Sequence, residues 1–139
     1  HLDTVFTAID YNKYTVHPEI VGPLQVFEIT PGTNGHRLNV REVDATLHDV
    51  LCKYTEVDDV DLITCGGDDM IAAQREQWND GSNVLAGAPG VVYAYERNIT
   101  TNDFLTENGI TVITVPGDEL GRGRGGPRCM SCPVVREAV

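Results

Sequence analysis

The sequence has no long hydrophobic run and has far fewer basic than acidic residues. No apolar stretch approaches the roughly 20 residues that a membrane-spanning helix needs, and the first residues lack the basic segment of a secretory signal. The 10 Lys and Arg residues face 21 Asp and Glu residues, so the formal net charge is −11. Because nucleic-acid binding needs a positive field, we expect no nucleic-acid partner and no membrane partner.

Cysteine is also scarce. The 139 residues contain 4 cysteines, which are Cys52, Cys65, Cys129 and Cys132. This number is low for a disulfide scaffold of this length, so we expect a reducing compartment and a cytoplasmic protein. Position 1 is histidine and not methionine, which suggests a fragment or a processed chain.

The remaining composition is typical of one soluble domain over residues 1–139. Hydrophobic residues make up 41% of the chain and charged residues 22%. Alternating apolar residues predict strands, and apolar residues at helical spacing predict helices. We expect strands at 2–9, 23–30, 60–65, 83–90, 91–96 and 110–115. We expect helices at 43–54, 66–78 and 100–109.

The order of these elements favours an α/β fold with short strands and mixed pairing. The stretch PGTNG (31–35) predicts a turn, and residues 117–133 predict mostly loop with one more strand after it. Asp68 is a candidate N-cap of the second helix. Thr101 or Asn102 is a candidate N-cap of the third helix, and Gly109 is its expected end.

His1 and Asp3 form the first polar pair of the chain. On a strand they would share one face, with Cα atoms roughly 6.5–7 Å apart. This gap fits a small planar cation, because Asp3 could accept two hydrogen bonds from a guanidinium and His1 could move protons near neutral pH. A polar face on an edge strand is the simpler interpretation of these two residues alone.

The segment GRGRGGPRCMSCP (121–133) places glycines and arginines before a cysteine. Glycines let a ligand approach the backbone, and cationic side chains stabilise the thiolate that acts as a nucleophile. The pair Cys129 and Cys132 also allows a zinc half-site or a redox pair. Cys52 and Cys65 are too far apart in sequence for the second pair of a usual zinc site, and no thioredoxin-like context precedes the motif.

Four stretches together resemble the arginine deiminase family of the bacterial arginine dihydrolase pathway. They are HLDTVFT, GGDD…REQWNDGSNVLAGAPGVVYAYERN, ITVIT and ELGRGRGGPRCMSCP, and they follow the order of that family's C-terminal pattern. The resemblance implies part of a pentein α/β-propeller, in which ββαβ modules surround a pseudo-fivefold axis. About two modules would be present in this chain.

The resemblance also implies roles for five residues. Cys129 looks like the nucleophile, His1 looks like the general acid/base, and Asp3 looks like a carboxylate that grips the guanidinium. Gly123 and Arg124 resemble loop positions that close over bound arginine. The matching segment REQWND has no implied role in the site.

The activity that the resemblance implies is hydrolysis of free L-arginine to L-citrulline and ammonia, with a covalent S-alkylthiouronium intermediate on Cys129. No metal and no organic cofactor is expected. Family members are much longer. The resemblance implies a missing N-terminal part, on the same or a separate chain, that would hold a second guanidinium-binding carboxylate, a catalytic glutamate and substrate-binding arginines. We therefore expect the isolated chain to be inactive, and a homo-oligomer is possible. The alternative is a non-catalytic fragment for arginine binding or assembly.

Overall fold

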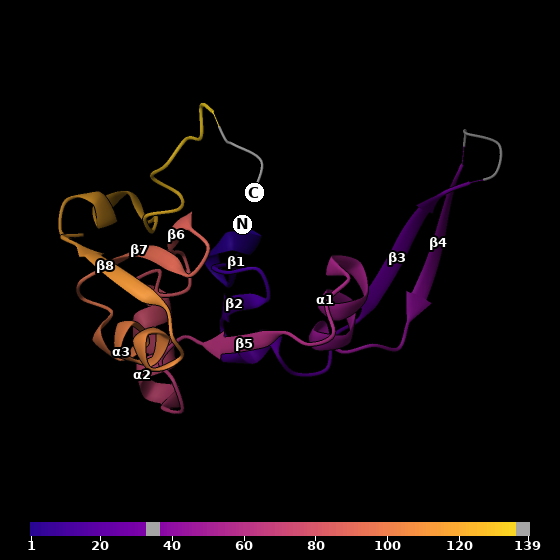
Figure 1. Cartoon of the computed structure of the whole chain (residues 1–139), viewed down its shortest axis with the longest axis horizontal. Helices are drawn as coiled ribbons and strands as arrows, with labels where there is room; N and C mark the ends of the chain where they lie inside the picture. Colours follow the sequence, from indigo (N-terminus) through magenta and orange to yellow (C-terminus); the bar gives the residue numbers. More distant parts are fainter. Residues whose placement is uncertain (33–36, 136–139) are drawn as a thin grey trace.

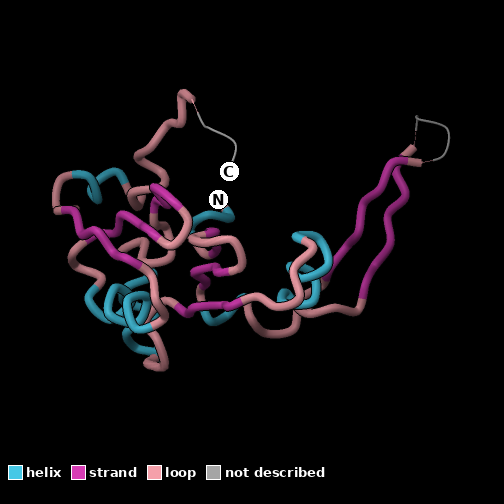
Figure 2. Tube along the Cα trace, in the orientation of Figure 1, coloured by secondary structure: helices cyan, strands magenta, loops and turns pink. Residues whose placement is uncertain are grey.

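The computed structural model describes residues 1–32 and 37–135. Figure 1 shows a mixed α/β chain in which one hairpin and one helix extend away from the remaining elements. The two ends of the described chain lie on the same side of the molecule, as the tube in Figure 2 also shows. In the described part, no helix is both long and apolar enough to cross a membrane.

Two three-stranded sheets have the same topology. In the first sheet, β1 (Phe6–Ala8) is antiparallel to β2 (Lys13–Val16), and β2 is parallel to β5 (Asp61–Thr64). In the second, β6 (Leu85–Ala88) is antiparallel to β7 (Val91–Tyr95), and β7 is parallel to β8 (Thr111–Val115). A helix precedes the third strand of each sheet.

Helix α1 (Leu47–Thr55) precedes β5, and helix α3 (Ile99–Glu107) precedes β8. Helix α2 (Met70–Trp78) connects the first sheet to the second. Each parallel pair needs such a crossover, because a tight turn can join only antiparallel strands.

A hairpin of β3 (Val26–Pro31) and β4 (Leu38–Val43) separates β2 from α1. One of its faces carries Glu28, whose carboxylate accepts hydrogen bonds from Arg41 on β4 and from Lys53 and Tyr54 on α1. The other face carries apolar side chains that are mostly exposed, namely Phe27, Ile29, Leu38 and Val40. The hydrogen bonds of Glu28 therefore link the hairpin to α1, which lies beside β3 in Figure 1.

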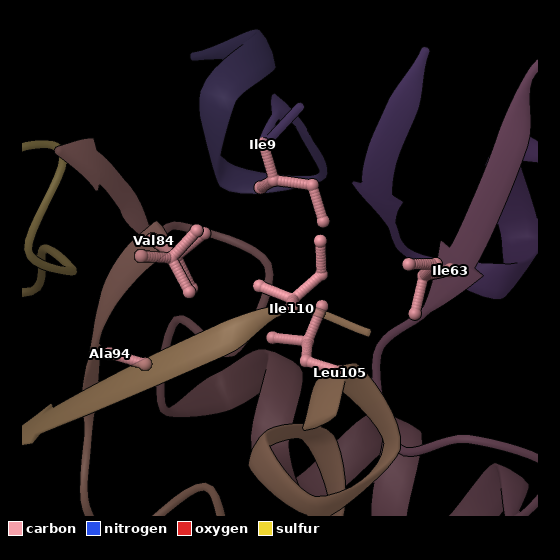
Figure 3. Close-up of a cluster of buried hydrophobic side chains, with 7 residues drawn as sticks. Ile9, Ile63, Val84, Ala94, Leu105 and Ile110 are labelled. Carbon is pink, nitrogen blue, oxygen red and sulfur yellow. The ribbon is translucent and has the colours of Figure 1, made fainter. Parts of the chain in front are cut away.

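The main core lies between the two three-stranded sheets and α3. Figure 3 shows Ile9, Ile63, Val84, Leu105 and Ile110 pointing toward one another from separate segments. Each of these side chains is 3% exposed or less. Burial of such side chains stabilises the fold by roughly 1.5–3 kcal/mol each, so this cluster fixes the relative position of the two sheets.

The helix ends differ from the sequence-based expectations at two caps. Asp69, and not Asp68, caps α2 by accepting hydrogen bonds from the Ile71 and Ala72 N–H groups. Asn98 occupies the N-cap position of α3 in place of Thr101 or Asn102. Gly109 follows the end of α3 with a φ of 83°, which confirms it as the residue that ends the helix.

The strand predictions were partly wrong. Residues 2–4 form a 3₁₀ turn, so the predicted strand 2–9 is reduced to β1, and the strands β2 and β4 were missed. The predicted helix at 43–54 starts later, because residues 38–43 belong to β4. Residues 117–133 form loops around a 3₁₀ turn (Leu120–Gly123), as expected. Most of the predicted 31–35 turn lies outside the described residues. The strand expected after residue 133 does not form at residues 134 and 135, and residues 136–139 lie outside the described residues.

Candidate active site

The first residues place His1 beside Asp3 by means of a turn. Hydrogen bonds from the Thr4 N–H to the His1 carbonyl (3.3 Å) and from the Val5 N–H to the Leu2 carbonyl (3.0 Å) close this turn. His1 Nδ1 lies 3.9 Å from Asp3 Oδ1. The expectation that a strand face holds the pair is wrong, because the chain bends here before β1 begins.

Two hydrogen bonds hold the Asp3 backbone, while one oxygen of the Asp3 carboxylate accepts no hydrogen bond from the described residues. The Asp3 carbonyl accepts hydrogen bonds from Asn83 Nδ2 (2.7 Å) and Thr7 Oγ1 (3.2 Å). The carboxylate oxygen Oδ1 is buried and accepts no hydrogen bond from residues 1–32 or 37–135. A buried carboxylate oxygen without a donor is unfavourable, so this atom is suited to accept a hydrogen bond from a bound cation.

The loop that carries Cys129 is fixed by two buried side chains. The Cys129 N–H donates to Asn83 Oδ1 at 3.0 Å. The Tyr95 hydroxyl donates to the Gly125 carbonyl at 2.8 Å, and burial raises the pKa of Tyr95. Gly126 packs so closely that a Cβ on it would lie 2.3 Å from the Asn83 carbonyl oxygen. The loop is thus anchored by its backbone, while the Cys129 thiol is free and exposed.

These contacts bring the first residues and the cysteine loop together. Asn83 bonds to the backbone of Asp3 with one end of its amide and to the backbone of Cys129 with the other. An open groove of about 610 Å³ is lined by His1, Asp3 and Arg128, among others. We call it the His1 groove. Cys129 itself is not one of its lining residues, but it directly follows Arg128 in the chain.

Arg124 lies beside a second groove, and Gly123 directly precedes it in the chain. The Arg124 backbone is left-handed (φ 59°, ψ 62°), and its guanidinium lies 4.2 Å above the Trp78 ring. Arg124 lines this groove together with Thr4 and Asp80. Gly123 is exposed at the end of the 3₁₀ turn. The structure therefore does not place these two residues in the His1 groove.

Two of the three arginines before Cys129 have partners elsewhere. Arg124 stacks on Trp78, and Arg122 Nε lies 3.2 Å from Glu119 Oε2. The charge of Arg124 also acts on Asp80: burial raises the pKa of Asp80, and the positive charges of Arg124 and Arg97 oppose this rise. Only Arg128 among the three lines the His1 groove.

Sequence reasoning missed the residues that support the site. Asn83 begins the predicted strand 83–90, and Gln77 has no implied role in the site. Gln77 Nε2 donates to the Thr4 carbonyl at 2.6 Å, and its Oε1 accepts from Ser82 Oγ at 3.2 Å. The only signal was that both residues lie in a stretch that follows the family pattern, since hydrogen bonds across the fold leave no local periodicity.

The zinc and redox alternatives for Cys129 and Cys132 receive no support. Both thiols are free and exposed. Within residues 1–32 and 37–135, the one group of potential metal ligands that converges includes neither cysteine.

Comparisons with known proteins identify the family. The family model described as Arginine deiminase matches residues 1–136. The chain belongs to the arginine deiminase family. The arginine deiminase of Treponema denticola is 58% identical over 139 residues, and that of Clostridium perfringens is 57% identical over 139 residues. The arginine deiminase of Streptococcus agalactiae serotype V is 54% identical over 137 residues.

The matches cover nearly all of this chain but only part of each relative. They include 100% of the chain and 34% of the Treponema denticola arginine deiminase. They include 99% of the chain and 33% of each of the other two relatives. The chain therefore spans about a third of the length of the arginine deiminases that it matches.

Proposed function

We propose that this chain is the part of an arginine deiminase that carries the nucleophile, the general acid/base and one guanidinium-binding carboxylate. The reaction is the hydrolysis of free L-arginine to L-citrulline and ammonia. The observation that carries the proposal is the double hydrogen bond of Asn83, which holds the Asp3 and Cys129 backbones beside the groove lined by His1. Membership in the family supplies the substrate class.

Cys129 is the proposed nucleophile. The guanidinium carbon is a weak electrophile because its charge is delocalised, so a thiolate must be held in line with it. The Cys129 thiolate adds to this carbon and forms a C–S bond. Anchoring of the loop through the Cys129 N–H and the Gly125 carbonyl supports this role, since it limits backbone motion next to an exposed thiol.

His1 is the proposed general acid and base. Its protonated imidazole gives a proton to the leaving nitrogen, which departs as ammonia and leaves an S-alkylthiouronium on Cys129. The neutral imidazole then takes a proton from water, which attacks the same carbon. Cleavage of the C–S bond yields the ureido group of citrulline and restores the thiolate. His1 lies beside Asp3 and lines the His1 groove, which supports this role.

Asp3 is the proposed guanidinium ligand. Its buried Oδ1 has no hydrogen-bond donor in the part of the chain that the structure describes, and a guanidinium N–H would supply one. The carboxylate would hold the plane of the guanidinium in a fixed orientation during both steps. Gly123 and Arg124 keep a proposed role in closing over arginine, which requires the loop to move from its present contact with Trp78.

We also propose that the two three-stranded sheets are two ββαβ modules of a pentein propeller. Their identical strand order and pairing directions support this assignment. The other two thirds of the length of the relatives would supply the remaining modules, on the same or a separate polypeptide. Those modules would add the second carboxylate, the glutamate and the arginines that bind the substrate carboxylate. The isolated chain is therefore expected to have little or no activity.

The test is an arginine-to-citrulline assay with and without the complementary part of a relative. The chain would be mixed with the preceding two thirds of the Treponema denticola deiminase. We expect no turnover by either part alone and turnover by the mixture. The Cys129→Ser variant should abolish this turnover, and the matched Cys132→Ser variant should retain it. Turnover by the Cys129→Ser mixture would disprove the assignment of the nucleophile.

The same materials test the alternative of a non-catalytic arginine-binding or assembly fragment. Calorimetry would measure arginine binding by the chain alone, by the mixture and by the Asp3→Asn variant of each. Asp3-dependent binding by a mixture that never forms citrulline would favour the alternative. Mass spectrometry of acid-quenched mixtures should show an arginine-derived adduct on Cys129 if the covalent route is correct.

A further inference from the structure

His48, Cys52 and Asp59 bring three different metal-ligating groups together, and none of them belongs to the candidate active site. One ligand atom from each lies within 4.8 Å of the other two. His48 Nε2 is 2.7 Å from Asp59 Oδ1 and 3.9 Å from Cys52 Sγ. We propose that this cluster binds one Zn²⁺ ion through the imidazole, the thiolate and the carboxylate, with water as the fourth ligand.

The fold builds this cluster from two adjacent segments. His48 and Cys52 are four residues apart on α1, so they lie on one face of the helix. A capping box between Thr46 and Asp49 fixes the first turn of the same helix. Because His48 lies inside this turn, its backbone position is set before any ion binds.

Asp59 comes from the connection between α1 and β5, and its backbone is also held. The Asn12 side chain donates to the Asp59 carbonyl at 3.3 Å. The Val60 N–H donates to Asp59 Oδ1 at 3.0 Å, which aims the carboxylate toward His48. An ion at this cluster would therefore connect α1 to the start of β5.

The donor set and its spacing fit zinc. Imidazole nitrogen, thiolate sulfur and carboxylate oxygen are the usual zinc ligands, and around a tetrahedral ion they lie about 3.3–3.6 Å apart. The observed 2.7 Å and 3.9 Å separations lie on either side of this range, and all three ligand atoms lie within 4.8 Å of one another, so the side chains must rotate to meet a single ion. Zinc would replace the proton between His48 and Asp59 and the thiol proton of Cys52, and both protons would pass to solvent.

A Cys–His–Asp nucleophile is the competing interpretation, and the geometry is against it. Cys52 Sγ lies 3.8 Å from His48 Nδ1 and 3.9 Å from Nε2. A sulfur almost equidistant from both ring nitrogens does not lie along the lone pair of either one, so the ring is not aligned to remove the thiol proton. A metal ion needs no such alignment between two of its ligands.

The test is direct titration of Zn²⁺ into the 139-residue chain. The Cys129→Ser and Cys132→Ser changes would be present together in every sample, because these exposed thiols can also bind metal. We expect one Zn²⁺ per chain by elemental analysis after dialysis. Co²⁺ in place of Zn²⁺ should show the near-ultraviolet band of thiolate-to-metal charge transfer and the visible bands of a tetrahedral ion.

Ligand variants and a matched control decide the result. Cys52→Ser, His48→Asn and Asp59→Asn should each weaken Zn²⁺ binding by about tenfold or more. Asp58→Asn removes the same charge from the neighbouring exposed residue. The Zn²⁺ affinity of this variant should stay within about twofold of the affinity of the chain without the change. Equal weakening by Asp58→Asn and Asp59→Asn, or a Co²⁺ spectrum that persists in Cys52→Ser, would overturn the proposal. Circular dichroism would show that each variant folds.

Discussion

The side chain of Asn83 links Asp3 to Cys129. Its Nδ2 donates to the Asp3 carbonyl at 2.7 Å, and its Oδ1 accepts from the Cys129 N–H at 3.0 Å. Asn83 is 0% exposed, so water cannot replace either bond without opening the core. One buried amide thus sets the spacing between the proposed guanidinium ligand and the proposed nucleophile.

Replacement of Asn83 by alanine should destabilise the fold by about 3 kcal/mol, because it removes the hydrogen bonds to the Asp3 carbonyl and the Cys129 N–H and leaves a cavity at a fully buried position. Urea denaturation measures this change. The matched control is Asn39→Ala on the exposed hairpin, which should change stability by less than about 0.5 kcal/mol. Equal effects of the two substitutions would contradict a structural role for Asn83.

The proposed guanidinium pocket predicts selective alkylation of Cys129. Chloroacetamidine is cationic, and neutral chloroacetamide has the same leaving group. The ratio of their rates at Cys129 should exceed the ratio at Cys132, which is an exposed thiol in the same molecule. Peptide mass spectrometry measures both sites at once.

The Asp3→Asn variant provides the control for this selectivity. It should bring the Cys129 rate ratio close to that of Cys132, because the preference for a cation depends on the carboxylate. A ratio at Cys129 that does not respond to Asp3→Asn would separate the thiol from the proposed pocket.

A buried carboxylate on α2 caps the N-terminus of α3. The Glu76 side chain is 0% exposed and accepts hydrogen bonds from the Thr100 N–H (3.0 Å), the Thr101 N–H (2.8 Å) and Thr101 Oγ1 (2.7 Å). Glu76→Ala should cost about 3 kcal/mol of unfolding free energy, since it leaves these donors unpaired at the positive end of the helix. Chemical denaturation would measure the loss.

The matched control for this prediction is Glu107→Ala. Glu107 is an exposed carboxylate at the other end of α3. Its removal should change stability by less than about 0.5 kcal/mol, and a small gain would fit the helix dipole. A loss as large as that of Glu76→Ala would contradict the capping explanation, because alanine favours a helix at least as well as glutamate.

Glu28 should make the attachment of the hairpin to α1 depend on pH. Hydrogen bonds from Lys53, Tyr54 and Arg41 lower the pKa of Glu28 from 4.5 to about 2. A folded-state pKa below the unfolded value stabilises the protein above the unfolded pKa. This contribution should therefore be complete above about pH 5 and should be lost as the pH falls toward 2.

Thermal unfolding of the unchanged chain and of Glu28→Gln would test this dependence. The difference between their midpoints should be present at pH 7 and should shrink between pH 4 and pH 2. Asp44→Asn, which changes an exposed carboxylate at the end of β4, serves as the control and should show no such convergence. A Glu28→Gln difference that stays constant over this range would contradict the role of ionised Glu28.

Local pattern was enough to predict the helices and most strands of the second sheet. The strands β7 and β8 are predicted by short runs of strand-forming residues, and the helix α3 is predicted by its N-cap candidates and Gly109. The strand β2 was missed, and Leu2–Thr4 was assigned to a strand although it forms a turn. These segments are short, and long-range contacts such as the pairing of β2 with β5 decide their conformation.

The sequence by itself determined the family and the kinds of groups that the candidate site offers, because whole stretches of residues carry that resemblance. Only the tertiary structure decided how those groups are held. Asn83 reaches a residue 80 positions before it and another 46 positions after it, and such contacts leave no periodic signal in the chain. The contact between Asp59 and His48 could not be predicted for the same reason. It depends on how the connection between α1 and β5 folds back toward the helix.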